Sequence, residues 1–220
     1  MSYSASIDFD KLRAAMVTGQ LISRNISDSK VLETFRRVPS HEFVPEDLRP
    51  SAYNDYPLPI GENQTISQPY MVALMTESLK LKGAGRVLEV GTGSGYQAAI
   101  LGEMSGEVYS VERFKELADR ASRVLSSLGY KNIHIKVGDG TLGWSEFAPY
   151  DGIVVTAGAP AIPESLVKQL KDGGRLVIPV DNGVFGQTLK SVERTGRTTR
   201  TSDICACKFV PLVGKEGWPE

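Results

Sequence analysis

The stretch from Val87 to Tyr96, VLEVGTGSGY, combines an acidic side chain with three glycines at two-residue spacing. A β-branched run that includes Glu89 ends just before Gly91, and Gly93 and Gly95 then lead into a segment of helical composition. Glycines in a turn between a strand and a helix allow positive φ and let the backbone approach a ligand closely. The same kind of turn serves several nucleotides, and a plain tight turn is the alternative, so neighbouring residues must identify the ligand.

The spacing and the charge of this turn favour S-adenosylmethionine (SAM) over a dinucleotide. A dinucleotide needs a G-x-G-x-x-G turn so that its pyrophosphate lies on the helix N-terminus, whereas this turn reads G-x-G-x-G. Glu89, two positions before the first glycine, would repel a pyrophosphate but could bind a cation. SAM has no phosphate and carries an ammonium and a sulfonium. We therefore predict a SAM site, with S-adenosylhomocysteine as the product after group transfer.

Two further acidic residues lie where an adenosine would extend from the glycine turn. Glu112 ends the run EVYSVE about twenty residues after the turn, where a carboxylate can accept hydrogen bonds from both ribose hydroxyls. NAD enzymes share this feature, so it supports an adenosine ligand without separating the two cofactors. Asp139 and Gly140 follow the next β-branched run, at the end where ligands bind in open α/β sheets. Asp139 could accept from the adenine amino group; a simple turn is the alternative for this pair.

Alternating elements must position these residues. Short β-branched runs at 86–91, 107–112, 132–139, 152–157 and 175–180 alternate with segments of helical period or composition at 95–104, 114–129 and 163–174. This alternation predicts a Rossmann-like, doubly wound α/β fold whose mostly parallel sheet carries helices on both faces. Two later strands, 185–194 and 202–212, have no helix between them, so an antiparallel C-terminal pair is expected, giving about seven strands.

The rest of the chain is interpreted as part of one domain, 1–220. Residues 1–64 form an N-terminal extension, with helices within 8–17 and 27–38 and a proline-rich stretch, 41–61, that should lack regular elements. Residues 65–180 form the cofactor-binding core, which begins with a helix at 69–83, and residues 181–220 form C-terminal strands near the substrate.

Composition limits the classes of partner. The 220 residues are 41% hydrophobic and 23% charged, and the net charge of −1 argues against a dedicated nucleic-acid binder. The sequence has no signal-peptide pattern at its start and no apolar run of about 18 residues, so we expect a cytoplasmic protein without a membrane span. Cys205 and Cys207 are too close for a long-loop disulfide and too few for zinc, so no metal site is predicted.

The acceptor is indicated by two other segments. TISQPYM, Thr65 to Met71, places hydroxyls and an amide before a helix, and Ser67 could simply cap that helix. After the fourth strand, adenine N-methylases carry an Asn/Asp-Pro-Pro-Tyr/Phe segment, but TAGAP, 156–160, has no amide, acid or aromatic side chain. A carboxylate acceptor needs no general base because it is already ionised near pH 7. His41 and His134 are weak candidates for chemistry.

In this order and spacing, TISQPYM, VLEVGTGSGYQAA, GDGTLGW, TAGAP and GGRLVIPV resemble the protein-L-isoaspartate O-methyltransferase family over nearly the whole chain. TISQPYM together with TAGAP is specific to that family, whereas the glycine turn is common to class I methyltransferases. The resemblance implies an enzyme that methylates the free carboxylate of L-isoaspartyl, and less well D-aspartyl, residues in damaged proteins and peptides. The ester would then collapse to a succinimide. We expect a monomer whose partners are such proteins, without nucleic acid or membrane.

The resemblance also implies roles for individual residues. Ser67 is the catalytic residue, and because a serine hydroxyl is a poor base we expect it to orient the acceptor carboxylate or the sulfonium. The implied cofactor-binding residues are Ile66, Gln68, Glu89, Gly91, Thr92, Gly93, Glu112, Asp139 and Gly140. The implied substrate-binding residues are Thr65, Ser67, Val210 and Leu212. Val213 stands where relatives often carry a hydroxyl residue, so no side-chain hydrogen bond is expected there.

Three other functions compete with this one. A SAM-binding module without catalysis would not need Ser67 together with the acidic residues of the cofactor site. An NAD oxidoreductase is disfavoured by the spacing of the glycine turn and by Glu89. A methyltransferase for nucleic acid or a small molecule is disfavoured by TAGAP and by the net charge.

Overall fold

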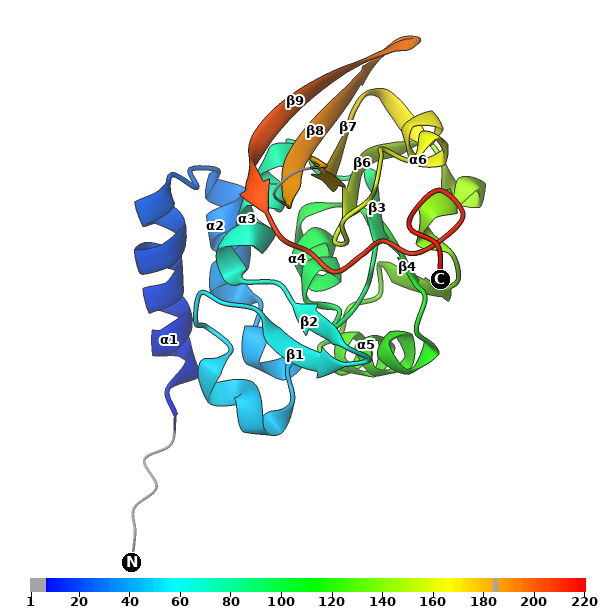
Figure 1. Cartoon of the computed structure of the whole chain (residues 1–220). Helices are drawn as coiled ribbons and strands as arrows, with labels where there is room; N and C mark the ends of the chain where they lie inside the picture. Colours follow the sequence, from blue (N-terminus) through cyan, green and yellow to red (C-terminus); the bar gives the residue numbers. More distant parts are fainter. Residues whose placement is uncertain (1–6, 184–185) are drawn as a thin grey trace, which may run out of the picture.

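The computed structural model, which describes residues 7–183 and 186–220, contains a seven-stranded sheet with the order β5-β4-β3-β6-β7-β8-β9 (Figure 1). The parallel strands are β3 (Arg86–Val90), β4 (Glu107–Glu112), β5 (Ile133–Val137), β6 (Tyr150–Val155) and β7 (Leu170–Asp181). The last two, β8 (Gln187–Thr195) and β9 (Thr198–Cys207), are antiparallel to their neighbours. The predicted doubly wound fold with an antiparallel C-terminal pair is therefore confirmed.

Helices cover both faces of the sheet because the central strands are apolar on both sides. Val87 of β3 packs in a core cluster with residues of α3 (Pro69–Leu79) and α4 (Tyr96–Met104). Leu88 and Val90 belong to the cluster on the other face, which includes Leu166 of α6 (Glu164–Lys168). The fifth helix, α5 (Lys115–Ser127), packs against β4 and β5. The carboxyl ends of β3, β4 and β6 consequently meet at one edge.

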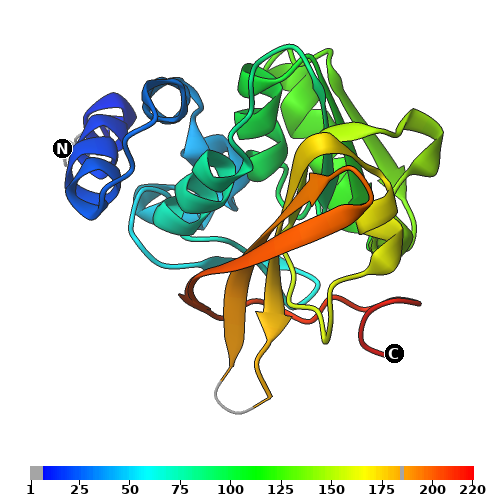
Figure 2. The ribbon, with the colours of Figure 1, turned by 90° about the horizontal axis from the view of Figure 1, so that it is seen from above.

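The N-terminal helices are grouped at one side of the molecule, outside α3 and α4 (Figures 1 and 2). The first, α1 (Phe9–Met16), continues through a π-helical turn, Val17–Leu21, and a 3₁₀ turn, Ile22–Arg24. The second, α2 (Ser29–Arg37), is capped at its N-terminus by Asp28, whose carboxylate accepts from the amides of Lys30 and Val31. This is the capping expected for an aspartate at that position. Within the described residues, no helix is long and apolar enough to cross a membrane.

The proline-rich stretch differs from the prediction that it lacks regular elements. It contains 3₁₀ turns at Ser40–Phe43 and Glu46–Ser51 and then β1 (Leu58–Gly61), which pairs with β2 (Gln64–Ile66). The turn between these strands has Glu62 and Asn63 at positive φ, as tight hairpin turns require. Proline is tolerated because β1 has only one strand partner in this two-stranded sheet.

Several predicted boundaries are also wrong. The helix predicted at 163–174 ends at Lys168, because the chain joins the sheet at Leu170 and pairs with Tyr150. The helix predicted to end near Gly83 stops at Leu79, where Lys80 adopts φ 51°. Phe185, at the start of one predicted C-terminal strand, lies outside the described residues. The other strand, predicted to reach residue 212, ends at Cys207. Both free cysteines are half-buried on it, as expected.

Candidate active site

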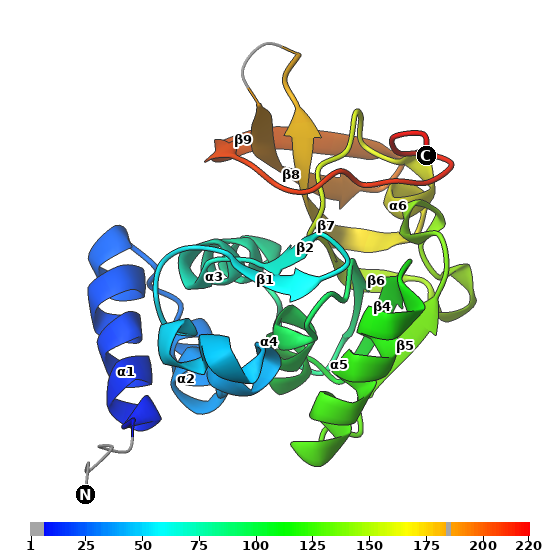
Figure 3. The ribbon, with the colours of Figure 1, turned by 60° about the horizontal axis from the view of Figure 1, so that its bottom comes forward.

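A cleft opens where β3, β4 and β6 end, and the space within it is about 980 Å³ with open solvent included. The predicted site residues that line it are Thr65, Ile66, Ser67, Gly91, Thr92, Gly93, Glu112, Gly140, Val210 and Leu212. Gln68, Glu89 and Asp139 are not among its lining residues. The β1–β2 hairpin and the C-terminal segment run alongside each other at this cleft (Figures 1 and 3).

The glycine turn depends on the absence of side chains. Gly91, Gly93 and Gly95 have φ of 96°, 53° and 89°, a region that residues with a Cβ rarely adopt. A Cβ on Gly91 would also collide with the Thr156 hydroxyl. That hydroxyl lies 2.7 Å from the Gly91 carbonyl oxygen and 3.1 Å from the Val90 carbonyl oxygen, to which it donates. Thr156, directly after β6, therefore fixes the start of the glycine turn by hydrogen bonds to its backbone.

The Glu112 carboxylate accepts from the Gly93 amide, a donor that a pyrophosphate at the glycine turn would need. One carboxylate oxygen accepts from the Gly93 amide at 2.8 Å, and the other accepts from the Phe114 amide at 2.9 Å. The side chain is buried, with the residue 4% exposed. A phosphate at the glycine turn would meet this negative charge in place of a free N–H group. The geometry therefore favours a ligand without phosphate, and it leaves the outer lone pairs of Glu112 for hydroxyl donors.

Glu89 lies behind the turn instead of in the cleft. It is 0% exposed, and the Ser110 hydroxyl donates to its carboxyl group and lies 2.5 Å from the Thr92 hydroxyl. Burial raises the pKa of Glu89 to about 8; Ser110 opposes this rise and the charge of Glu112 adds to it. At neutral pH the carboxyl group is therefore mostly protonated. Glu89 does not line the cleft, whereas Glu112 does; a role of Glu89 toward the cofactor stays a prediction.

The segment 64–68, which we call the strap, brings Ser67 to the cleft. The helix α3 begins at Pro69 with Gln68 as its N-terminal cap residue, and no side chain caps it. Within the described residues the Ser67 hydroxyl has no hydrogen-bond partner, so capping does not explain this serine. The Gln68 amide instead lies 3.4 Å from the Asp55 carboxylate.

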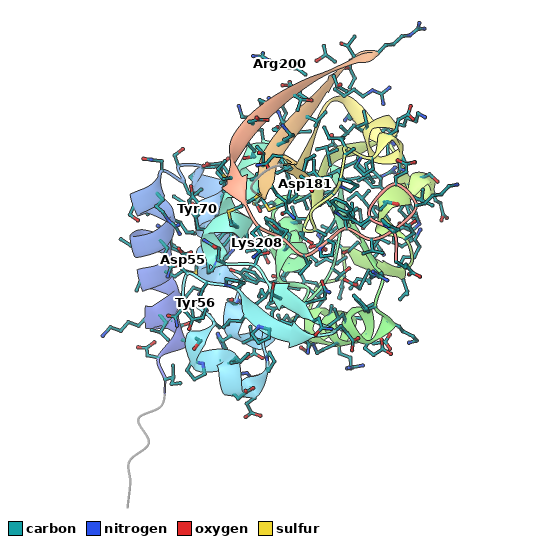
Figure 4. The ribbon with its side chains drawn as sticks, viewed as in Figure 1. Asp55, Tyr56, Tyr70, Asp181, Arg200 and Lys208 are labelled. Atoms are coloured by element: carbon teal, nitrogen blue, oxygen red, sulfur yellow. The ribbon has the colours of Figure 1, made fainter. Side chains whose placement is uncertain are left out.

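Asp55 connects the strap to the N-terminal helices. Its carboxylate pairs with Arg24 at 2.6 Å, and the Arg24 guanidinium stacks over the Tyr70 ring at 3.7 Å from its centre. Asp55 and Tyr70, the second residue of α3, therefore both contact Arg24, and Figure 4 labels them on the same side of the molecule. The proline-rich stretch is thereby attached to both the N-terminal helices and the strap.

Asp139 and Gly140 behave differently from each other. A Cβ on Gly140 would lie 2.5 Å from Val90, so only glycine fits between the strand end and the cleft. The Asp139 carboxylate accepts from the amide and hydroxyl of Thr141 and from the Lys215 amide, all within 2.9 Å. Burial acts to raise the pKa of Asp139, but these hydrogen bonds outweigh burial and hold the pKa below its ordinary value. Its contact with a ligand stays a prediction.

The C-terminal segment is fixed to TAGAP through Gly158. The Gly158 amide donates to the Val210 carbonyl at 2.7 Å, and its carbonyl accepts from the Leu212 amide at 2.8 Å. Further along, the Trp218 indole donates to the same carbonyl at 3.0 Å. The Glu216 carboxylate accepts from the amide and hydroxyl of Ser165. Val210 and Leu212 are therefore held at the mouth of the cleft.

Other lining residues were not predicted. Tyr96 and Gln97 follow the glycine turn directly, and Arg113 and Phe114 follow Glu112 directly, so proximity to a motif was the available signal. Val72 and Met75 also line the cleft from α3.

Neither histidine belongs to the cleft. The His41 ring stacks on Phe9 and its Nδ1 lies 2.7 Å from the Tyr53 hydroxyl, while His134 pairs with Glu107 on the sheet. These contacts agree with the prediction that both histidines are weak candidates for a role in the chemistry.

Comparison with known proteins gives concordant results. The sequence model of the family described as Protein-L-isoaspartate(D-aspartate) O-methyltransferase (PCMT) matches residues 12–217. The chain is 56% identical to the protein-L-isoaspartate O-methyltransferase of Syntrophotalea carbinolica, covering 97% of this chain and 99% of that one. It is 54% identical to protein-L-isoaspartate O-methyltransferase 1 of Syntrophobacter fumaroxidans, covering 96% and 99%.

Solved structures agree. One protein-L-isoaspartate O-methyltransferase superposes with a TM-score of 0.83 at 31% identity, covering 93% of this chain and 67% of that chain. A protein-L-isoaspartate O-methyltransferase from Plasmodium falciparum, solved in complex with S-adenosyl-L-homocysteine and described as putative in its name, superposes with a TM-score of 0.79. It is 26% identical, and the match covers 93% of this chain and 98% of that one.

Proposed function

The chain belongs to the protein-L-isoaspartate(D-aspartate) O-methyltransferase family, and on this premise we propose how its residues divide the work of methyl transfer. It is an enzyme that transfers a methyl group from SAM to the free carboxylate of L-isoaspartyl residues in proteins. The methyl ester then collapses to a succinimide. SAM supplies a methyl group on a positively charged sulfur, which becomes a neutral thioether after transfer.

The cleft fits SAM by the chemistry of its lining. Glu112 is proposed to accept from the ribose hydroxyls, because its two inner hydrogen bonds fix the carboxylate and leave outer lone pairs free. Gly91, Thr92 and Gly93 are proposed to hold the methionine part through their backbone. Gly140 is proposed to lie against the adenine, since no side chain fits there.

Three predicted cofactor residues are proposed to act less directly. Glu89 would support the glycine turn through Ser110 and Thr92, in keeping with its burial behind the turn. Gln68 would fix the strap through Asp55, while Ile66 covers the cofactor. Asp139 would reach the adenine amino group with a lone pair that Thr141 and Lys215 leave free, and its hydrogen bonds to these two residues support a role in ordering that end of the cleft.

Ser67 is proposed to orient the acceptor carboxylate by donating a hydrogen bond. The unpartnered hydroxyl at the cleft is the observation that carries this role. No general base is needed, because an isoaspartyl carboxylate is ionised near neutral pH. The nearby Thr156 hydroxyl is committed to backbone carbonyls of the glycine turn, so it is not available as a base. Alignment and exclusion of water then lower the barrier.

The peptide is proposed to bind between Thr65 on the strap and Val210 and Leu212 on the C-terminal segment. We propose the corresponding division of one domain: 1–64 supports the strap, 65–180 binds the cofactor and 181–220 contributes to the peptide site. A monomeric state, a cytoplasmic location and the absence of a nucleic-acid partner stay predictions.

One assay tests the activity against its alternatives. Methyl transfer from labelled SAM is measured with an isoaspartyl peptide and with its aspartyl twin of identical sequence, and S-adenosylhomocysteine is added as a competing product. We expect labelling of the isoaspartyl peptide only, suppressed by the product. Equal labelling of both peptides would indicate another methyltransferase activity. Binding of SAM without labelling of either peptide would indicate a non-catalytic module.

A further inference from the structure

A buried polar pair joins α3 to α4 beside the cleft. Gln97, in the first turn of α4, is 7% exposed, and Thr76, in the middle of α3, is 1% exposed. The Gln97 amide nitrogen Nε2 lies 3.0 Å from the Thr76 hydroxyl oxygen. Their neighbours on the two helices, such as Met75 and Leu101, are apolar. Polar side chains are costly to bury in such a place unless they are fully paired.

The Gln97 amide is only half paired. Within the described residues, its carbonyl oxygen Oε1 is buried and has no hydrogen-bond partner. Thr76 fixes which end of the amide is left over. The single hydroxyl proton of Thr76 is donated to the Val72 carbonyl at 2.7 Å, so the Thr76 oxygen can only accept from Gln97. Nε2 must therefore face Thr76, and Oε1 is the free end.

Gln97 lines the cleft at the start of α4, directly after the glycine turn that is assigned to the methionine part. The lining also includes Val72 and Met75 of α3, which packs on β6 and β7. The groups assigned to the ribose and adenine, Glu112 and Gly140, lie on the other side, after β4 and β5. The methionine part of SAM, which is opposite the adenine in the molecule, therefore lies nearest to Gln97. Its ammonium carries three N–H donors.

We propose that Gln97 Oε1 accepts a hydrogen bond from the ammonium of the methionine part of SAM, and that Thr76 is the positioning residue that holds the amide in that orientation. This inference rests on the proposed placement of the cofactor. It adds a side-chain acceptor from α4 to the backbone groups of the glycine turn. It also connects the methionine part to α3, the helix that begins directly after the strap and Ser67.

Comparing the binding of two ligands, one with the ammonium and one without it, distinguishes this contact from a purely structural role of Gln97. S-adenosylhomocysteine carries the ammonium, whereas 5′-methylthioadenosine is the same nucleoside thioether without the amino acid. Binding of each is measured by titration calorimetry to the wild-type protein and to Gln97→Met, which keeps the length of the side chain but removes its acceptor. We expect affinity for S-adenosylhomocysteine to fall about 10- to 100-fold, because a hydrogen bond to a charged group is lost. Affinity for 5′-methylthioadenosine should be unchanged.

Matched variants report on the role of Thr76. Thr76→Val keeps the shape but removes the hydroxyl, and should weaken S-adenosylhomocysteine alone, whereas Thr76→Ser should restore binding. Gln169→Met is the control for loss of a buried glutamine, since Gln169 is also 7% exposed but lies outside the cleft lining. It should weaken neither ligand. Thermal unfolding of each variant confirms that it is folded.

The outcomes divide as follows. A parallel loss of affinity for both ligands in Gln97→Met would mean that the residue only supports the shape of the cleft, and would overturn the proposal. Unchanged affinity for both ligands would overturn it as well. If the wild-type protein bound neither ligand, the assigned cofactor site itself would be wrong, which is a different failure.

Discussion

Glu89→Gln should remove most of the pH dependence that this buried carboxyl group gives to folding. In the folded protein the pKa of Glu89 is raised from the ordinary 4.5 to about 8, chiefly by burial. Between these two values the folded chain holds a proton that the unfolded chain has lost. Stability therefore falls as pH rises through this window and levels off above about pH 8. A glutamine has the same shape and can still accept from Ser110, but it never ionises.

The size of the effect follows from the same interval. Each pH unit corresponds to about 1.4 kcal/mol, so the interval from 4.5 to about 8 sets an upper bound on the order of 5 kcal/mol on the penalty for Glu89. The free energies of unfolding of the variant and the wild type should be similar near pH 5. The variant should be more stable by several kcal/mol at pH 9.

Urea unfolding followed by tryptophan fluorescence, at intervals between pH 5 and pH 9, measures this difference. Glu116→Gln is the control for loss of a carboxylate at an exposed position, because Glu116 is exposed on α5. If the curves for Glu89→Gln and wild type fell in parallel with pH, Glu89 would not carry the raised pKa. The account of a protonated carboxyl group behind the glycine turn would then be refuted.

Three further changes test other parts of the site. Ser67→Ala should lower turnover about 100-fold with little change in SAM affinity, because an orienting donor is lost. Steady-state rates measure the turnover and titration measures the SAM affinity. A collapse of SAM binding with unchanged turnover per bound SAM would contradict the role proposed for Ser67. Gly91→Ala should lower the free energy of unfolding by about 1–3 kcal/mol and abolish SAM binding, because φ at Gly91 is 96° and a Cβ would collide with Thr156. Urea unfolding measures the stability, and a variant as stable as the wild type would exclude this strain. Glu216→Ala should destabilise the C-terminal segment by on the order of 1 kcal/mol and raise KM for the peptide, because the Ser165 amide and hydroxyl lose their acceptor. An unchanged KM would show that Glu216 does not hold the peptide side of the cleft.

The core of the fold could be predicted because its strands are short, β-branched and buried on both faces. The hairpin β1–β2 could not, because Pro57 and Pro59, just before and within its first strand, suggested an irregular stretch. The available signal was Glu62 and Asn63 between two runs, IG and QTI, since a tight turn between short strands needs residues that tolerate positive φ.

The cleft itself was predicted better than the direction of its side chains. Gly91 and Glu112 line it because motif spacing determines where strands end. Glu89 and Asp139 are equally close in sequence to their motifs, yet their carboxyl groups turn elsewhere. Glu89 is on the face that packs under α4, and Asp139 meets Lys215, 76 residues further along the chain. Partners that are so distant in sequence leave no local signal.

The C-terminal segment connects the proposed peptide site to the proposed adenine site. One continuous stretch pairs with Gly158 beside the former and with Asp139 and Thr141 beside the latter. A displacement of this stretch by one ligand would therefore reach the proposed site of the other. By linkage, any factor by which bound SAM tightens the damaged peptide must equal the factor by which the peptide tightens SAM.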